Sequence, residues 1–308
     1  MKLIAGTRGS KLALIQCSMV VKTLASSMPD LELEQRIIKT SGDRDQSTPI
    51  HEMAGDGAFE KELDAAVLNG QADFAVHSMK DVPTLLPEGL VIAAVPERAS
   101  RSDAIVSKGS LKLNELPAGA VIGTGSVLRR AELQSHKRDA ILKDIRGNVD
   151  TRLSKLDGGE YDAIIVASAA LERMGLQDRI AETLNTSDFM PAAGQGAIAL
   201  ITRKDNSNAL DALRRINNQV SMTEALAERT AISVIGGGCK VPVGAIASVS
   251  GDTIEISCVA FSKQGKSIKR SAMGGVSTAE SIAKSLGWEM LSAGAESMLR
   301  EWQASAGA

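Results

Sequence analysis

Apolar and polar residues along the first hundred positions alternate in ways that predict short strands and amphipathic helices in turn. Residues 31–38 place an apolar side chain at nearly every second position against charged neighbours, which is the period of a strand with one wet face. From Ser10 onward apolar residues recur at helical spacing, and Ser10 is predicted to cap that helix. A second helical stretch covers 59–68 and ends at Gly70. Further short strands are predicted at 3–6, 72–78 and 90–95.

The same rhythm restarts near residue 103, where apolar runs typical of buried strands alternate with helical stretches. The strands are predicted at 103–107, 120–123, 140–145 and 161–167, and the helices at 126–137 and 148–157. Strands that alternate with helices predict a doubly wound α/β sheet. Two such blocks in succession indicate two α/β domains with a cleft between them, and ligands bind such sheets beyond the carboxyl ends of the strands.

The last hundred residues change character. Three strands, at 243–249, 253–260 and 267–273, precede one long helix that is predicted to begin at Thr278. We interpret this part as a smaller α+β domain. The predicted division is 1–96 with 197–214 for domain 1, 97–196 for domain 2, and 215–308 for domain 3.

Composition narrows the possible functions of this 308-residue chain. Lys and Arg number 35 against 37 Asp and Glu, for a net charge of −2, and no long block of the chain is strongly basic. Aromatic residues make up only 2%, too few for a platform on which nucleic-acid bases stack. A nucleic-acid partner is therefore not expected.

Cysteine and histidine usage argues against a metal centre. Cys17, Cys239 and Cys258 are an odd number without C-x-x-C spacing, and the three histidines are equally scattered, so neither a disulfide framework nor a zinc cluster is expected. The start lacks the apolar core of a signal peptide, and Pro and Gly interrupt the longest uncharged run, 189–202. We expect no membrane contact and a cytoplasmic location.

The segment HSMKDVP follows a predicted buried strand and places Lys80 and Asp81 where that strand runs into a loop. This is the ligand-binding edge of an open α/β sheet. Pro83 biases Val82 toward an extended backbone, which would fix the direction of the preceding acid. The alternative is a surface ion pair, which contributes little to stability or function.

Arginines gather at the predicted helix starts of domain 2. In GTGSVLRR, Arg129 and Arg130 stand in a first helical turn, where free backbone amides already favour an anion. Arg146 precedes a helix that Asn148 is predicted to cap; the set is completed by Arg152 and Arg173. Such arginines suit carboxylates, although each taken alone could equally belong to a solvated surface paired with acids.

Cys239 has an unusual setting in GGGCKVPVG, because it follows three glycines and precedes a cation, Lys240, that would lower the pKa of its thiol. Cys17 and Cys258 lie instead in apolar segments and are predicted to be structural. No histidine is near Cys239 in sequence, so a covalent attachment point and a nucleophile with a distant base both remain open.

Seven segments in this order, TRGSKLAL, TSGDRD, HSMKDVP, GTGSVLRR, RGNVDTRLSKLDGGEYDAIIVA, MPAAGQGA and GGGCKVPVG, resemble the porphobilinogen deaminase (hydroxymethylbilane synthase) family from Lys2 to about Ala260. The resemblance implies three domains, two of them like the lobes of periplasmic binding proteins. It also implies a dipyrromethane cofactor bound to Cys239 through a thioether. Four porphobilinogen molecules are then joined to this primer with loss of ammonia, and hydroxymethylbilane is released by hydrolysis. No metal or nucleotide is implied, and we expect a monomer.

The resemblance also implies roles for single residues. The catalytic acid falls on Asp81, which would hold pyrrole N–H groups and stabilise the cation that forms as ammonia leaves. Cofactor-binding positions fall on Ser78, Lys80, Thr124, Ser126, Arg129, Arg130 and Arg146. Substrate-binding positions fall on Arg8, Ser10, Gln16, Arg146, Arg152 and Arg173.

Two features depart from the family pattern. Glu52 and Asp56 stand in a loop where many relatives have lysines, so we do not expect that loop to hold the anionic chain. GTGSVLRR is one residue longer than the usual GTSSLRR, which could rotate Arg129 and Arg130 or only lengthen the turn. The competing classes are a non-catalytic carboxylate-binding protein of two lobes and a papain-like thiol enzyme.

Overall fold

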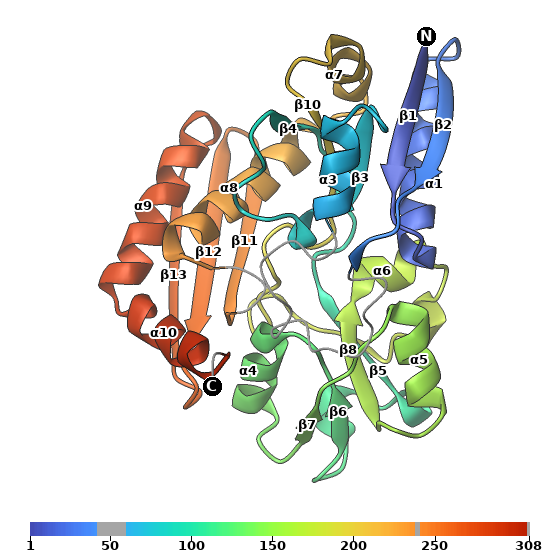
Figure 1. Ribbon diagram of the computed structural model, residues 1–308. Helices are drawn as coiled ribbons and strands as arrows, with labels where there is room; N and C mark the ends of the chain where they lie inside the picture. Colours follow the sequence, from blue (N-terminus) through green and yellow to red (C-terminus); the bar gives the residue numbers. More distant parts are fainter. Residues whose placement is uncertain (42–59, 238–240, 307–308) are drawn as a thin grey trace.

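The computed structural model describes residues 1–41, 60–237 and 241–306, which form two α/β lobes and a smaller third domain (Figure 1). Each lobe is built on a five-stranded mixed sheet, and the third domain on a three-stranded antiparallel sheet covered by helices. The predicted α/β fold class is confirmed, with an antiparallel strand inside each of the two larger sheets.

The first sheet has the strand order β2-β1-β3-β10-β4. Its strands are β1 (Lys2–Thr7), β2 (Glu32–Ile37), β3 (Phe74–Ser78), β4 (Leu90–Ala94) and β10 (Ile198–Arg203). Its helices are α1 (Lys11–Ser27), α3 (Lys61–Leu68) and α7 (Ser207–Arg214). β1 runs parallel to β2 and β3, whereas β10 runs antiparallel to β3 and β4.

The second sheet repeats this plan in the order β7-β6-β8-β5-β9. Its strands are β5 (Asp103–Ser107), β6 (Val121–Gly123), β7 (Ile141–Lys143), β8 (Ala163–Ala167) and β9 (Glu182–Thr183). Its helices are α4 (Val127–His136), α5 (Val149–Asp157) and α6 (Ser168–Arg173). β6 runs parallel to β7 and β8, and β5 runs antiparallel to β8 and β9.

The third domain combines a long helix with the three-stranded sheet β11-β12-β13. Its elements are α8 (Gln219–Ile235), β11 (Val243–Ser250), β12 (Thr253–Phe261), β13 (Ser267–Gly275), α9 (Ala279–Ser292) and α10 (Ala295–Ala306). Short 3-10 turns join elements throughout, as η1 (Met79–Asp81), η2 (Lys108–Ser110), η3 (Leu113–Glu115), η4 (Gln177–Arg179) and η5 (Val276–Thr278). In Figure 1 the α8 helix lies between this sheet and the first lobe.

Apolar side chains explain why the elements stack in this way. Separate buried clusters form around Leu3 and Leu200 and around Leu63 and Ile201 in the first lobe, since alternate residues of each strand point to opposite faces. The second lobe is built in the same way. A smaller cluster joins Leu128 of α4 to β12, so the second lobe also contacts the third domain.

Several local predictions are confirmed. Ser10 caps α1, where its Oγ accepts a hydrogen bond from the Ala13 amide at 3.3 Å. The helix expected at 59–68 is α3, followed by Gly70 with φ +69°; Phe59 lies outside the described residues. Val82 has the extended backbone expected before Pro83.

Three expectations need correction. The C-terminal helix is not continuous, because Gly294 adopts φ +103° and separates α9 from α10. Ile37 is 55% exposed, because it ends β2 at the edge of its sheet. Asn148 stands at the start of α5, but its side chain makes no capping hydrogen bond.

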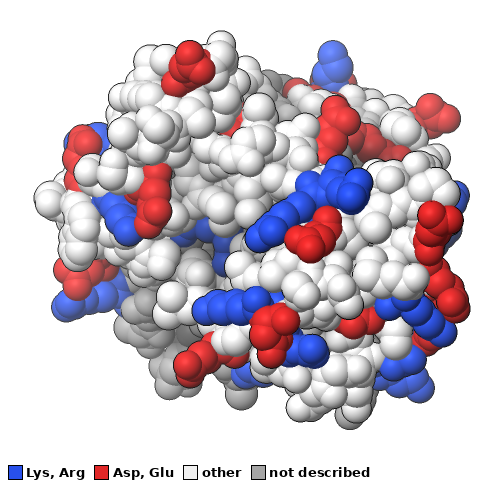
Figure 2. Space-filling model, turned by 90° about the horizontal axis from the view of Figure 1, so that it is seen from above, with Lys and Arg blue, Asp and Glu red and all other residues white. Residues whose placement is uncertain are grey.

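Among the described helices, none is both long and apolar enough to cross a bilayer. The same residues contain no group of three or more His, Cys, Asp and Glu side chains arranged to bind a metal ion. Figure 2 shows Lys and Arg side chains interspersed with Asp and Glu on the face seen from above, so exposed charges of both signs are mixed there.

Candidate functional site

The end of β3 brings Lys80 and Asp81 to the border between the two lobes. Met79 is fully buried and anchors the turn η1 in the core of the first lobe. The chain after Asp81 is held from the third domain, because the Arg229 guanidinium of α8 donates to the carbonyls of Val82 at 2.7 Å and Pro83 at 2.5 Å. The direction in which the turn presents Asp81 is therefore set by two domains.

Lys80 points toward the second lobe. Its Nζ donates a hydrogen bond to Gln195 Oε1 at 3.2 Å. Burial lowers the pKa of Lys80, and the nearby Arg129 lowers it further, while Asp81 and Asp103 act in the opposite direction. The ammonium thus lies in a region that already has positive charge.

Asp81 is partly exposed and lies within electrostatic reach of Lys80 and Arg152. No side chain or amide of the described residues donates a hydrogen bond to its carboxylate. An acid in that state can accept hydrogen bonds from the N–H groups of a ligand.

The start of α4 uses its hydroxyl groups to order the turn after β6. Ser126 Oγ accepts from the Arg129 amide at 3.4 Å, and Thr124 Oγ1 accepts from the Ser126 amide at 3.2 Å. Thr124 is 1% exposed. Both predicted cofactor-binding hydroxyls therefore lie at a helix N-terminus, where backbone amides favour anions.

Arg129 and Arg130 diverge. Buried Arg129 forms a bidentate ion pair with Asp103, with Nε–Oδ2 at 2.9 Å and Nη2–Oδ1 at 2.6 Å. Arg130 instead donates to Asp144 Oδ1 at 2.6 Å and to the Leu142 carbonyl at 3.2 Å, beside β7. Each of these two arginines therefore already has an internal carboxylate partner in the described structure, and their predicted role in binding an external anion stays a prediction.

Arg152 on α5 has a different environment. Its Nε donates to the Gly147 carbonyl at 2.8 Å, and no carboxylate of the described residues hydrogen-bonds to it. Burial, together with the neighbouring Arg129 and Arg146, lowers the pKa of Arg152 to about 10, whereas Asp81 acts in the opposite direction. Arg146 lies just before α5 and within electrostatic reach of Arg152, so the structure brings these two predicted residues together.

Arg173 lies in the last turn of α6, not at a helix start as expected from the sequence. Its Nη2 donates to the Gly196 carbonyl at 2.6 Å, and burial lowers its pKa to about 10. The contact with Gly196 places Arg173 beside the segment that returns the chain to the first lobe.

The remaining predicted residues come from the start of the first lobe. Gln16 of α1 is 3% exposed, and its amide is 3.2 Å from the Ser78 hydroxyl at the end of β3. Arg8 and Ser10 lie in the turn between β1 and α1, and α1 contacts α6 of the second lobe. The start of the first lobe thus reaches the second lobe through α1, the helix that these residues precede or belong to.

Cations outnumber ionised acids at this border. Two further cations, Arg129 and Arg146, and two carboxylates, Asp81 and Asp103, lie close enough to Lys80 or Arg152 to change their pKa values. Buried Glu132 lies near Asp103, and burial together with Asp103 raises its pKa well above the usual value. The group has a surplus of positive charge in partly desolvated surroundings, and an anionic ligand would neutralise it.

Cys239 and Lys240 lie outside the described residues, as do Glu52 and Asp56, so their predicted roles stay predictions. The chain reaches the cysteine segment from α8, which ends at Gly236 with φ +78°. Cys17 and Cys258 are buried, and burial raises their thiol pKa values to about 11 and about 12. Neither is suited to form the thiolate that attacks an electrophile.

Two residues of the site were missed by sequence reasoning. Asp103 was interpreted only as the start of a strand, and Gln195 only as part of the segment MPAAGQGA. A signal was present in both cases: Asp103 is a charged residue that opens an apolar strand, and Gln195 is a polar residue flanked by glycines within an apolar stretch.

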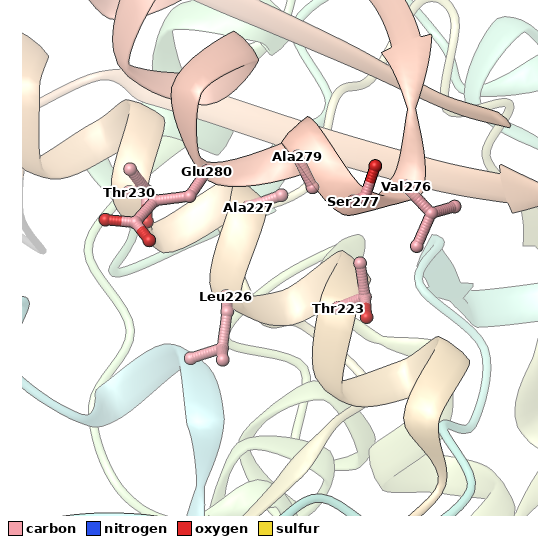
Figure 3. A pocket seen from close by; sticks show the side chains of 8 residues that line it. All are labelled: Thr223, Leu226, Ala227, Thr230, Val276, Ser277, Ala279 and Glu280. Carbon is pink, nitrogen blue, oxygen red and sulfur yellow. The ribbon is translucent and has the colours of Figure 1, made fainter. Parts of the chain in front are cut away.

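A separate pocket of about 340 Å³ lies between α8 and the start of α9 (Figure 3). Leu226, Thr230 and Val276 line it, with Glu280 as its charged side chain. Glu280 already pairs with Lys284 at 2.7 Å. A pocket whose charged side chain is an acid does not suit a ligand rich in carboxylates, so the lobe border remains the candidate site.

Comparison with known proteins identifies relatives of the chain. Residues 3–211 match the family model described as "Porphobilinogen deaminase, dipyromethane cofactor binding domain", and residues 222–292 match "Porphobilinogen deaminase, C-terminal domain". The chain is 44% identical over 256 residues to the porphobilinogen deaminase of Lysinibacillus sphaericus, covering 83% of each chain. It is 38% identical over 304 residues to a probable porphobilinogen deaminase of Nitrosopumilus maritimus, covering 98% of this chain and 97% of the relative. Among solved structures, the methionine-binding protein MetQ aligns with a TM-score of 0.45 at 14% identity, over 72% of this chain and 92% of that one.

Proposed function

This chain belongs to the porphobilinogen deaminase family, and we propose that it joins four porphobilinogen molecules head to tail on a dipyrromethane primer. Ammonia leaves at each addition, and hydrolysis finally releases hydroxymethylbilane. The chain is accordingly a transferase of tetrapyrrole biosynthesis. The observation that carries the assignment is the surplus of partly buried cations around Asp81, because every pyrrole unit brings an acetate and a propionate group.

The donor set fits a dipyrromethane. Guanidinium groups match carboxylates in geometry as well as charge. Arg146 and Lys80 would hold its carboxylates, with Thr124 and Ser126 beside them at the N-terminus of α4. When bound through Cys239, the group supplies the pyrrole carbon to which the first substrate molecule is joined.

Arg129 and Arg130 were predicted to bind the same cofactor. We propose that Arg129 contributes through its position, since its ion pair with Asp103 fixes a positive charge next to Lys80. Arg130 would contribute only after releasing Asp144, because the pair already occupies its Nη2. Their roles are therefore unequal.

Asp81 would act on the substrate itself. Its carboxylate can accept hydrogen bonds from pyrrole N–H groups, and its negative charge stabilises the cation that develops as the ammonia leaves. A preorganised charge of this kind is effective because it needs no reorganisation during the reaction.

The substrate enters from the side of the first lobe in this proposal. Arg8, Ser10 and Gln16 stand near α6, and Arg152 and Arg173 face them from the second lobe. We further propose the division into domains at 1–96 with 197–214, 97–196 and 215–308, with a monomeric enzyme acting in the cytoplasm.

The stoichiometry of the reaction, measured as ammonia and hydroxymethylbilane formed per porphobilinogen consumed, tests the proposal. Purified protein is incubated with porphobilinogen, and ammonia, remaining substrate and hydroxymethylbilane are quantified over time. One ammonia per porphobilinogen consumed and one hydroxymethylbilane per four are expected. Binding of porphobilinogen without ammonia release would instead favour a reversible carboxylate-binding protein.

A further inference from the structure

Gln195 stands where the two lobes and their connections meet. The chain crosses between the lobes twice, from β4 to β5 and from β9 back to β10. Gln195 lies in the second crossing, three residues before β10, and is 1% exposed. A buried primary amide is costly unless its donors and acceptors are satisfied.

The side-chain amide of Gln195 donates two hydrogen bonds and accepts two, and its partners come from the first crossing, the first lobe and the second lobe. Its Nε2 donates to the Arg101 carbonyl in the first crossing at 2.8 Å and to Asp103 Oδ1 at 2.7 Å. Its Oε1 accepts from Lys80 Nζ and from Arg129 Nη2, each at 3.2 Å. One oxygen thus bridges a cation of the first lobe and a cation of the second.

The two glycines that flank Gln195 have backbone conformations and close contacts that a residue with a side chain would not tolerate. Gly194 has φ +76°, and a Cβ there would lie 2.5 Å from the Met79 side chain. Gly196 has φ +85°, and a Cβ there would lie 2.5 Å from the carbonyl oxygens of Ala99 and Ser100. The segment therefore approaches both η1 and the other crossing more closely than other residues would allow.

We propose that Gln195 is a positioning residue that sets the geometry and the charge of Lys80 for binding the carboxylates of the pyrrole chain. This inference rests on the proposed function, because it assigns Lys80 to an anionic ligand. Like-charged Lys80 and Arg129 repel each other, and an oxygen between them offsets that repulsion while fixing the distance across the lobe border.

The charged groups around Lys80 determine the sign of the effect. Arg129 and Arg152 disfavour its charged form, and Asp81 and Asp103 favour it. Gln195 Oε1 accepts a hydrogen bond from the ammonium and so stabilises the charged form. Removal of this oxygen lowers the pKa of Lys80, and replacement by a carboxylate raises it.

The test measures Lys80 directly in the full-length protein. Competitive labelling with an amine-specific reagent over a range of pH, read by mass spectrometry of the Lys80 peptide, gives the midpoint at which the amine loses its proton. In Gln195→Leu and Gln195→Asn, whose shorter amide does not reach Nζ, the midpoint falls by about one pH unit, the equivalent of one hydrogen bond to a charged group. In Gln195→Glu it rises above that of the unsubstituted protein.

Turnover supplies a second readout. The alkaline limb of the pH–rate profile with porphobilinogen should move in the same direction as the labelling midpoint in each variant, and KM should rise more than kcat falls. Gln177 is an exposed glutamine, so Gln177→Leu and Gln177→Glu serve as matched controls and should shift neither quantity. Gln195→Asn retains most of the side-chain volume, which keeps the test informative if Gln195→Leu does not fold.

An unchanged Lys80 midpoint in folded Gln195→Asn would overturn the inference, as would a midpoint in Gln195→Glu that is not above the unsubstituted value. Both results would leave the proposed function intact, because the unsubstituted protein would still release ammonia from porphobilinogen. Absence of ammonia release from the unsubstituted protein would refute the proposed function instead, while the labelling shifts would remain measurable.

Discussion

The two lobes share one topology but differ in the charged side chains that they bring to their common border. In each sheet the antiparallel strand next to the edge is the one that the chain reaches by crossing from the other lobe: β10 in the first and β5 in the second. Antiparallel pairing places the start of β10 beside Ser78 at the end of β3, and the start of β5 beside Ala167 at the end of β8. Both crossings therefore arrive at the edge where ligands bind.

The equivalent turns of the two lobes differ in chemistry. The turn after β1 leads to a serine cap, Ser10, and the turn after β6 leads to a serine cap, Ser126. The helix after Ser126 then carries Arg129 in its first turn, whereas the first lobe contributes the acid Asp81 after β3. The same strand order thus occurs in both lobes, but the arginines proposed to bind the ligand lie in the second lobe and Asp81 lies in the first.

Arg129→Met is expected to have the largest effect on stability. It leaves Asp103 buried without its bidentate partner, and breaking a buried ion pair in this way lowers the free energy of unfolding by about 3–5 kcal/mol. Chemical denaturation should show this loss. The double variant Arg129→Met with Asp103→Leu should recover much of it, because no unpaired buried charge remains; an equally unstable double variant would show that the pair is not the cause.

Asp81→Asn is expected to have the next largest effect, and the effect is on rate. It keeps the shape of the side chain but removes the charge that stabilises the cation left on the substrate as ammonia departs, so porphobilinogen consumption should fall about 10²-fold or more. The thermal midpoint should change little, because the described residues make no hydrogen bond to this carboxylate. Consumption within a few-fold of the unsubstituted rate would contradict the role of the first lobe.

Arg152→Met should reduce turnover of porphobilinogen about tenfold, the equivalent of one hydrogen bond to a charged group. Its pKa is held below the ordinary value, so its charge costs stability in the folded protein, and the thermal midpoint should stay equal or rise. Rate measurements with porphobilinogen and thermal unfolding measure the two quantities. Arg179→Met, at a surface pair with Asp157, is the matched control; a lower midpoint in Arg152→Met would show that the residue is structural like Arg129.

Arg130→Met is expected to have the smallest effect. The ion pair with Asp144 is partly exposed, and pairs of this kind contribute at most about 1 kcal/mol. Cofactor loading, measured by intact mass, should fall only slightly. A larger fall would mean that Arg130 releases Asp144 to bind the ligand, and would make the two adjacent arginines equivalent after all.

Sequence patterning predicted most of the fold because strands and helices here follow their apolar periods closely. The turn after β3 was predictable for the same reason, since Pro83 and the buried strand before it fix where Asp81 lies. The partner of Arg129 was not predictable, because Asp103 is 26 residues away and reaches it only through the strand order of the second lobe. The four side-chain hydrogen bonds of Gln195 could not be predicted either, because they depend on how the two crossings between the lobes lie relative to each other.

The central claim is that the cations at the lobe border hold a pyrrole chain carried by Cys239, and intact mass tests it most directly. A thioether resists thiol reduction, unlike a disulfide. The account predicts that purified protein exceeds its 32.3 kDa chain mass by two linked pyrrole units after reduction. Peptide mapping should place them on Cys239 rather than on buried Cys17 or Cys258, and Cys239→Ser should lose both the excess and the activity while remaining folded. Fully active protein with an unmodified mass would contradict the account.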